Sequence, residues 1–173
     1  MNLKITPLKN KLKKYLEDKE VIDILLFGSF VKGKQSPGDI DVAIITEKDV
    51  PIVIPGFHVS ILKPEDFFKS LSLINTLLRE GYSLKNNKPF SELYSFLSRV
   101  LFVYELSNLK PSKKVMIVNF LHGKNNNLGM VEENSGKWLA NQVFIVPINK
   151  NYIFEKFFLN MGVKFKRLFL LIH

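Results

Sequence analysis

Residues 25–45 read LLFGSFVKGKQSPGDIDVAII, and this stretch decides the fold. An apolar strand runs into Gly28 and Ser29, a short basic turn follows, and a second apolar strand opens with Asp39 and Asp41. Successive side chains of a strand point to opposite faces, so we expect the two carboxylates on one face, roughly 7 Å apart at their Cα atoms. Two carboxylates at that spacing can converge on one or two divalent cations.

The Gly28-Ser29 pair follows the strand Val21–Phe27 and suits a close approach of the backbone to a ligand. A helix starting there would aim free N–H groups at phosphate oxygens. A Gly-Ser pair alone is usually a turn, and Asp-X-Asp at a strand edge is often merely solvated. Their combination on adjacent strands instead indicates a site that transfers a phosphoryl or nucleotidyl group.

The stretch resembles the polymerase-β-like nucleotidyltransferases, most closely the small, minimal members of that superfamily. Their signature is an apolar residue, Gly, then Gly or Ser, nine to thirteen residues, then Asp, apolar, Asp or Glu, apolar. The chain supplies Phe27-Gly28-Ser29, nine intervening positions and Asp39-Ile40-Asp41-Val42. The likeness covers about residues 20–65. Lys32-Gly33 stands where many members have Arg-Gly, and Gly38 where many have Ser.

The resemblance implies a fold, a cofactor and a substrate. Asp39 and Asp41 would hold Mg²⁺ or Mn²⁺, and an NTP such as ATP would be the substrate. Lys32 or Lys34 would neutralise the charge of the triphosphate. The residues expected to bind the nucleotide are Gly28, Ser29, Lys32, Lys34 and Ser36.

The expected third strand, residues 57–62, departs from the family pattern. In the family this strand usually carries a third carboxylate, whereas here His58 or Ser60 stands about where it should be. His58 is therefore a candidate catalytic residue that could ligate a metal or act as a base, the alternative being a partly buried strand histidine. Glu65 and Asp66 follow Pro64, and we interpret them mainly as acids of a helix first turn.

Composition limits the class of protein. The chain has 173 residues, 46% of them hydrophobic and none of them cysteine, so we expect one domain plus an appendage, without disulfides or thiolate metal sites. Its apolar runs are too short to span a bilayer, and the N-terminus lacks the apolar core of a signal peptide. We therefore expect a cytoplasmic protein with no membrane association. The net charge of +9 suits polyanions, although a basic balance is also common in lysine-rich proteomes.

The pattern along the chain predicts an α/β (α+β) fold, in which a small mixed sheet flanked by helices is followed by a small α+β lobe. We expect a nucleotidyltransferase-like domain over residues 1–106. Its helices are predicted at 7–20, 64–80 and 89–106, with a turn at 82–88 that could be a hairpin. The core face of the third helix would consist of Leu93, Phe96, Leu97, Val100, Leu101 and Tyr104.

Residues 107–173 form the predicted C-terminal lobe, with ten basic and three acidic residues. We expect helices at 112–121 and 152–161, short strands near Met130 and at 143–148, and a last strand at 163–172. Such a lobe fits a small nucleic-acid-binding module that contacts RNA, and an interaction or dimerisation lobe fits nearly as well. The basic surface proposed for a nucleic-acid backbone comprises Lys113, Lys114, Lys164, Lys166 and Arg167.

Three functions follow from these features. The first is a metal-dependent enzyme that transfers a nucleoside monophosphate from an NTP to a hydroxyl of RNA, a protein side chain or a small molecule. The second is a nucleotide- or RNA-binding module that kept the fold and lost the chemistry, as the missing third carboxylate favours. The third is an interaction module with a protein partner, since some minimal nucleotidyltransferases are antitoxins paired with a small helical toxin.

Overall fold

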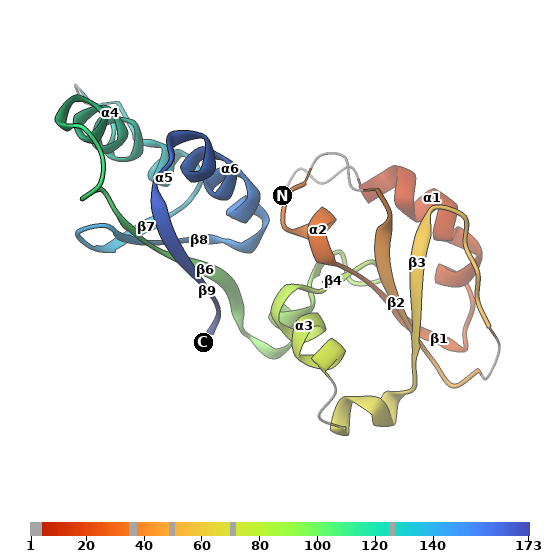
Figure 1. Ribbon diagram of the computed structural model, residues 1–173. Coiled ribbons are helices and arrows are strands. Elements are labelled where there is room, and N and C mark those ends of the chain that lie inside the picture. The colour runs from red at the N-terminus through yellow and green to blue at the C-terminus, as the bar shows by residue number, and fades with distance from the viewer. Residues whose placement is uncertain (1–4, 35–37, 49–50, 70–71, 125–126) are drawn as a thin grey trace. The chain divides into compact units, whose positions relative to one another are not determined.

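A computed structural model describes residues 5–34, 38–48, 51–69, 72–124 and 127–173 (Figure 1). The chain divides into two compact units between Leu97 and Ser98. The sequence had suggested a boundary after residue 106. Each unit has its own sheet and its own hydrophobic core.

The N-terminal unit is built on a mixed five-stranded sheet with the strand order β3-β2-β1-β4-β5. Its strands are β1 (Val21–Phe27), β2 (Ile40–Thr46), β3 (Phe57–Leu62), β4 (Tyr82–Ser83) and β5 (Lys88–Pro89). Strand β1 is antiparallel to β2 and β4, β4 is antiparallel to β5, and β2 is parallel to β3. The predicted mixed sheet flanked by helices is confirmed, and the predicted turn at 82–88 is the β4–β5 hairpin.

Helices cover both faces of this sheet, because β1 and β2 are apolar on both sides. The helical elements are α1 (Ile5–Leu16), α2 (Gly28–Val31), the 3₁₀ turn η1 (Pro64–Phe68), α3 (Ser72–Glu80) and the 3₁₀ turn η2 (Phe90–Tyr94). One face packs against α1 through Leu8 and Leu12. The opposite face packs against α3 through Ile74 and Leu77.

A buried carboxylate fastens the β4–β5 hairpin to β1. Asp23 accepts hydrogen bonds from the Ser83 hydroxyl at 2.6 Å, from the Asn86 amide at 3.2 Å and from the backbone N–H of Lys85 at 3.3 Å. A buried acid is costly unless such donors satisfy it. These bonds fix the hairpin against a strand some sixty residues earlier in the chain.

The C-terminal unit has the order β-α-β-β-α-β of a ferredoxin-like unit, with one short extra helix. Its elements are β6 (Leu97–Glu105), α4 (Pro111–His122), α5 (Met130–Glu133), β7 (Lys137–Ala140), β8 (Val143–Pro147), the 3₁₀ turn η3 (Ile148–Lys150), α6 (Asn151–Met161) and β9 (Lys164–Ile172). The sheet order is β7-β8-β6-β9, with β8 antiparallel to both β6 and β7. The helices lie on one side of the sheet (Figure 1).

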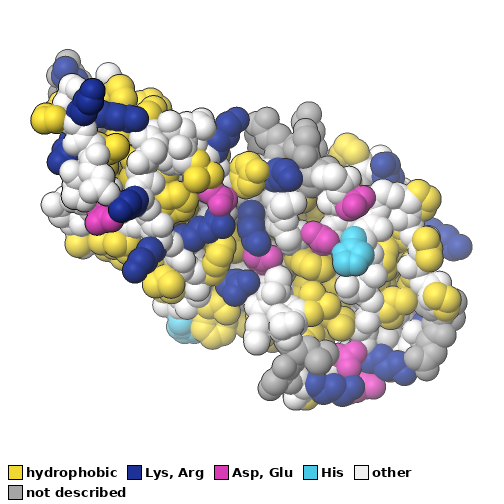
Figure 2. Space-filling view, viewed as in Figure 1, with side chains coloured by type: hydrophobic (Ala, Val, Ile, Leu, Met, Phe, Trp, Pro, Cys, Tyr) yellow, Lys and Arg dark blue, Asp and Glu magenta, His cyan; other side chains and the backbone are white. Residues whose placement is uncertain are grey.

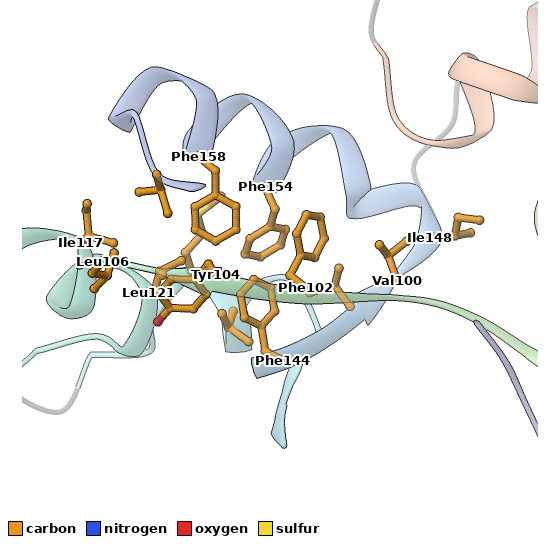
Figure 3. Packing of buried hydrophobic residues seen from close by; sticks show 14 residues of the cluster. Val100, Phe102, Tyr104, Leu106, Ile117, Leu121, Phe144, Ile148, Phe154 and Phe158 are labelled. Atoms are coloured by element: carbon orange, nitrogen blue, oxygen red, sulfur yellow. The ribbon is translucent and has the colours of Figure 1, made fainter. Parts of the chain in front are cut away.

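Aromatic side chains form the core between this sheet and its helices (Figure 3). Phe102 of β6 stacks on Phe144 of β8, with ring centroids 5.3 Å apart, and both contact Phe154 of α6. Tyr104 lies within the same cluster, and burial raises its pKa to about 12. The core therefore uses the inward side chains of both central strands.

The structure contradicts the helix predicted over residues 89–106. That segment is the turn η2 followed by strand β6, in which Ser98, Val100, Phe102 and Tyr104 point inward at every second position. Leucine, valine and tyrosine at these spacings satisfy a helical stripe and a strand alternation alike. Pairing with β8 decides in favour of the strand.

Other boundaries differ in detail. The predicted helix 64–80 is two elements, η1 and α3, and the helix predicted at 7–20 is α1, which ends at Leu16. The segment near Met130 is helix α5 rather than a strand, and β7 was not predicted. Strands β1 and β3 begin and end where predicted, and helices α4 and α6 and strands β8 and β9 lie within a residue or so of their predicted ranges.

The alternation of buried and outward-facing side chains along β6 predicts which substitutions destabilise the C-terminal unit. Phe102→Ala should lower the free energy of unfolding of the C-terminal unit by about 3–5 kcal/mol, because it empties a fully buried site. Its neighbour Val103 points outward and is 40% exposed, so Val103→Ala should cost about 1 kcal/mol or less. The only tryptophan of the chain, Trp138, packs on this core, so its fluorescence during urea denaturation reports this unit. Equal losses at both positions would contradict the strand.

Candidate functional site

The turn from β1 into α2 brings the backbone of Gly28 against a carboxylate. The β1–β2 register pairs Phe27 with Asp41, the last pair of that ladder. Gly28 has φ +74°, and a Cβ atom there would collide with the Asp41 carboxylate. Glycine fits this position at little cost, because it adopts positive φ readily and has no Cβ atom to collide with the carboxylate.

Strand β3 adds an imidazole to the same place. In the parallel β2–β3 pair Asp41 lies opposite His58, and the Nδ1 atom of His58 is 3.2 Å from Oδ1 of Asp41. The His58 side chain is 73% exposed and that of Asp41 30% exposed, so both are open to a ligand. Ser60, the other candidate of the sequence analysis, lies opposite Ala43 instead. The register therefore places His58 beside Asp41.

Asp39 occupies a different environment. It lies in the exposed bend just before β2, which begins at Ile40, so the structure does not place it within the strand. Over the described residues, no three His, Cys, Asp or Glu side chains come together as a ready metal cluster. Asp41 and His58 are thus brought together, and a shared site for Asp39 and Asp41 stays a prediction. Ser36 lies outside the described residues.

Lys32 forms an ion pair that the sequence did not predict. Its ammonium lies 3.0 Å from Oε2 of Glu80, the last residue of α3. The Glu80 side chain is 1% exposed and that of Lys32 is 26% exposed. The pair therefore connects the turn after α2, just downstream of Gly28, to the C-terminal end of α3. The ion pair gives Lys32 a structural partner, and a phosphate contact by Lys32 or Lys34 stays a prediction.

Glu80 left a signal in the sequence. A carboxylate at the C-terminal end of a helix is mildly unfavourable to the helix dipole, which hints at a partner but does not require one. Lys34 lies in the same turn as Ser29, since its backbone N–H donates to the Ser29 carbonyl at 3.0 Å.

Asp66 has a structural role, as the sequence indicated. Its carboxylate accepts a hydrogen bond from the Lys69 ammonium at 2.7 Å and one from the backbone N–H of Lys63 at 2.8 Å. Those two bonds, the Lys69 contact first, lower the pKa of Asp66 and hold the start of η1.

The donor set suits a divalent cation that arrives with a nucleotide. Mg²⁺ is commonly held by one or two carboxylates together with substrate phosphates rather than by an all-protein cage. Asp41 offers a partly exposed carboxylate directly beside a backbone that lacks a side chain at Gly28, and Figure 2 shows a histidine beside acidic side chains over this unit. The residues present are therefore compatible with such a cation, and a role for Asp41 as its ligand stays a prediction.

Comparison with known proteins identifies the family of the chain. The sequence profile of a family described as "Polymerase beta, Nucleotidyltransferase" matches residues 10–142, which is most of the chain. Searches of curated proteins and of solved structures gave no match. The chain belongs to the polymerase-β-like nucleotidyltransferase family, so the family resemblance inferred from the sequence is confirmed. Across the described residues, no helix is long and apolar enough to cross a membrane.

The contact between Gly28 and Asp41 can be tested with a matched glycine. Gly56 has φ +78°, close to that of Gly28, but a Cβ atom there would meet nothing within 4 Å. Gly28→Ala and Gly56→Ala should both lose roughly 1–2 kcal/mol of stability from the left-handed backbone. Only Gly28→Ala should also displace Asp41, and so weaken Mn²⁺-dependent NTP binding in isothermal titration by about tenfold or more. Equal binding by the two variants would make Gly28 a simple turn residue.

The ion pair between Lys32 and Glu80 predicts that Lys32 contributes more to stability than the nearby Lys34 does. Lys32→Met leaves the buried Glu80 without its cation, so it should cost about 2–3 kcal/mol, somewhat below the value for a fully buried pair because Lys32 is partly exposed. Lys34→Met, two residues away, should cost less than about 0.5 kcal/mol. Hydrogen exchange of residues 21–46 would measure the difference. Similar exchange rates in both variants would show that the pair does not hold the turn.

Proposed function

We propose that this nucleotidyltransferase moves a nucleoside monophosphate from an NTP to a hydroxyl acceptor, with Mg²⁺ or Mn²⁺ held by Asp39 and Asp41. The observation that carries the proposal is the position of Asp41, whose carboxylate lies against the Gly28 backbone and beside His58. That arrangement offers a cation ligand and open backbone within one turn, as a metal-bound triphosphate requires. Family membership supports the reaction class.

Each residue would have a distinct role. Gly28 and Ser29 would hold the triphosphate, and Lys34 would offset its charge. The two oxygens of the Asp41 carboxylate have different neighbours, because Oδ1 lies 3.2 Å from Nδ1 of His58 and Oδ2 points to Gly28. The bound cation would stabilise the charge that develops on the α-phosphate and on the departing pyrophosphate.

His58 is the proposed general base. With Nδ1 directed at Asp41, its Nε2 atom remains available to accept the proton of the acceptor hydroxyl. A carboxylate that orients an imidazole in this way is a common device for fixing its tautomer. The hydroxyl oxygen then bonds to the α-phosphorus while the bond to pyrophosphate breaks.

A second candidate function has its own supporting observation. The position beside Asp41 on β3 holds an imidazole, whereas members of the family usually carry a third carboxylate there. A chain without that carboxylate could retain nucleotide binding and lack transfer, either as a nucleotide- or RNA-binding module or as an antitoxin-like partner of another protein. The acceptor of the enzyme is left open among RNA, a protein side chain and a small molecule.

The proposal is tested by incubating the protein with each NTP radiolabelled at the α-phosphate, with Mg²⁺ or Mn²⁺, using total RNA and the protein itself as acceptors. Transfer should require the metal, and Asp41→Asn should lower it by about 100-fold or more. His58→Ala should lower kcat by about 100-fold, whereas His58→Asp should retain activity by supplying a carboxylate. Ser60→Ala, two residues along the same strand, is the matched control and should behave like the parent.

The outcomes separate the candidates. Metal-dependent NTP binding without transfer to any acceptor would favour the catalytically degenerate module. Neither binding nor transfer would favour the antitoxin-like interaction module.

A further inference from the structure

The sheet of the C-terminal unit has one face that its helices leave open. Phe102 and Phe144 point to the helices, so the residues between them on each strand point the other way. We call the surface formed by these residues the outer face. Its centre lies on β6 and β8 and is aliphatic, with the antiparallel pairs Leu101–Ile145 and Val103–Val143.

Lysines line the two edges of the outer face. Lys137 on β7 pairs with Ile145, so it extends the Leu101–Ile145 row to one edge of the sheet. On the opposite edge strand, β9, the exposed Lys164 and Lys166 alternate with Phe165, which packs inward. None of these three lysines forms an ion pair with any residue that the structure describes. Both edges are therefore basic and the centre is apolar.

The basic surface expected from the sequence is divided by this arrangement. Arg167 lies on the inner side, where its guanidinium contacts the Glu155 carboxylate at 2.6 Å and Asn151 at 3.3 Å. Lys113 and Lys114 lie on α4, which packs on the helical side of the sheet. Of the five predicted residues, Lys164 and Lys166 alone belong to the outer face.

The outer face lacks what single-stranded nucleic acid needs. Four-stranded sheets that bind RNA stack bases on aromatic side chains of their central strands. Here the aromatic residues of β6 and β8, Phe102, Tyr104 and Phe144, are all buried under the helices. The open side of those strands carries leucine, valine and isoleucine, which suit a protein surface rather than a base.

We propose that the outer face binds an amphipathic helix of a protein partner, with an apolar stripe and acidic residues along both flanks. The charged residues pointing outward from the four strands are three lysines, Arg99 and one acid, Glu105, so the face favours an acidic partner. The edge strands of a four-stranded sheet lie roughly 14 Å apart, which spans a helix about 10–12 Å wide. Strands β6 and β9 have nine residues each, roughly 30 Å, the length of a helix of about 20 residues.

This inference is independent of the proposed function, because none of the nucleotide-site residues belongs to this unit. Leu139 and Leu168 support it, since both are more than half exposed, and Leu168 follows Lys164 and Lys166 on the same face of β9. On both edge strands, β7 and β9, exposed leucines therefore lie close to exposed lysines. A partner helix would cover the former and pair with the latter.

The test uses a fluorescein-labelled peptide of about 20 residues, designed as a helix with a leucine stripe flanked on both sides by glutamates. Fluorescence anisotropy with the full chain should show saturable binding that weakens as salt is raised. Changing Lys137, Lys164 and Lys166 together to Gln should weaken binding by about tenfold or more. Lys113→Gln with Lys114→Gln, on the helical side, should leave it unchanged. Leu168→Ser should also weaken it, with Trp138 fluorescence showing that the unit stays folded.

Two further probes define what would overturn the proposal. The same peptide with lysines in place of glutamates should not bind, and equal binding of both peptides would refute charge recognition. Loss of binding in the Lys113 and Lys114 variant, or no binding of the acidic peptide, would remove the outer face as its site. Binding of a mixed 20-nucleotide RNA that depends on Lys137, Lys164 and Lys166, without peptide binding, would assign the face to nucleic acid instead.

Discussion

The Asp41 carboxylate lies against the backbone of Gly28, and the candidate site of the N-terminal unit depends on that contact. It exists because β1 and β2 pair in a register that ends at Phe27 and Asp41. Both strands are buried on both faces, so a slip of one residue would exchange two complete sets of packed side chains. The apolar interior of the sheet therefore fixes the position of a polar group at its edge. The same register, continued in parallel to β3, brings His58 to Asp41.

The second constraint on the turn is the ion pair between Lys32 and Glu80, which connects the turn to α3. Lys32 follows α2 in the turn, whereas Glu80 ends a helix almost fifty residues later. A buried pair of this kind contributes little net stability, because both ions lose water, yet breaking it exposes the full cost of an unpaired carboxylate. Its effect is thus to make one geometry of the turn much better than its alternatives. The conformation at Gly28 is held by the packing of α3 as well as by local sequence.

The sequence predicted what depends on local pattern and missed what depends on partners. Strands β1 and β3 and the Gly28 turn follow from apolar runs and from glycine, so their bounds were predicted closely. The residues of β6 fit a helix and a strand equally, and the choice comes from pairing with β8, a segment forty residues later that local periodicity cannot include. The same limit explains why the sequence could place both His58 and Ser60 only approximately at the position of the third carboxylate until the β2–β3 register put His58 opposite Asp41. It also explains why Glu80 was not seen as a partner of Lys32.

On the proposed function, the imidazole on β3 changes the charge balance of the site. Asp39, Asp41 and a third carboxylate would carry three negative charges, whereas Asp39, Asp41 and His58 carry two at most, since an imidazole supplies none. Two opposite unit charges 4 Å apart attract each other by about 4 kcal/mol at an effective dielectric constant of 20. Without the third carboxylate, the site would therefore bind a bare cation considerably more weakly. The same change reduces repulsion of the triphosphate by a comparable amount. A cation that binds Asp41 weakly by itself but strongly with phosphate oxygens would therefore enter as part of the nucleotide complex, and the nucleotide would become the determinant of metal binding.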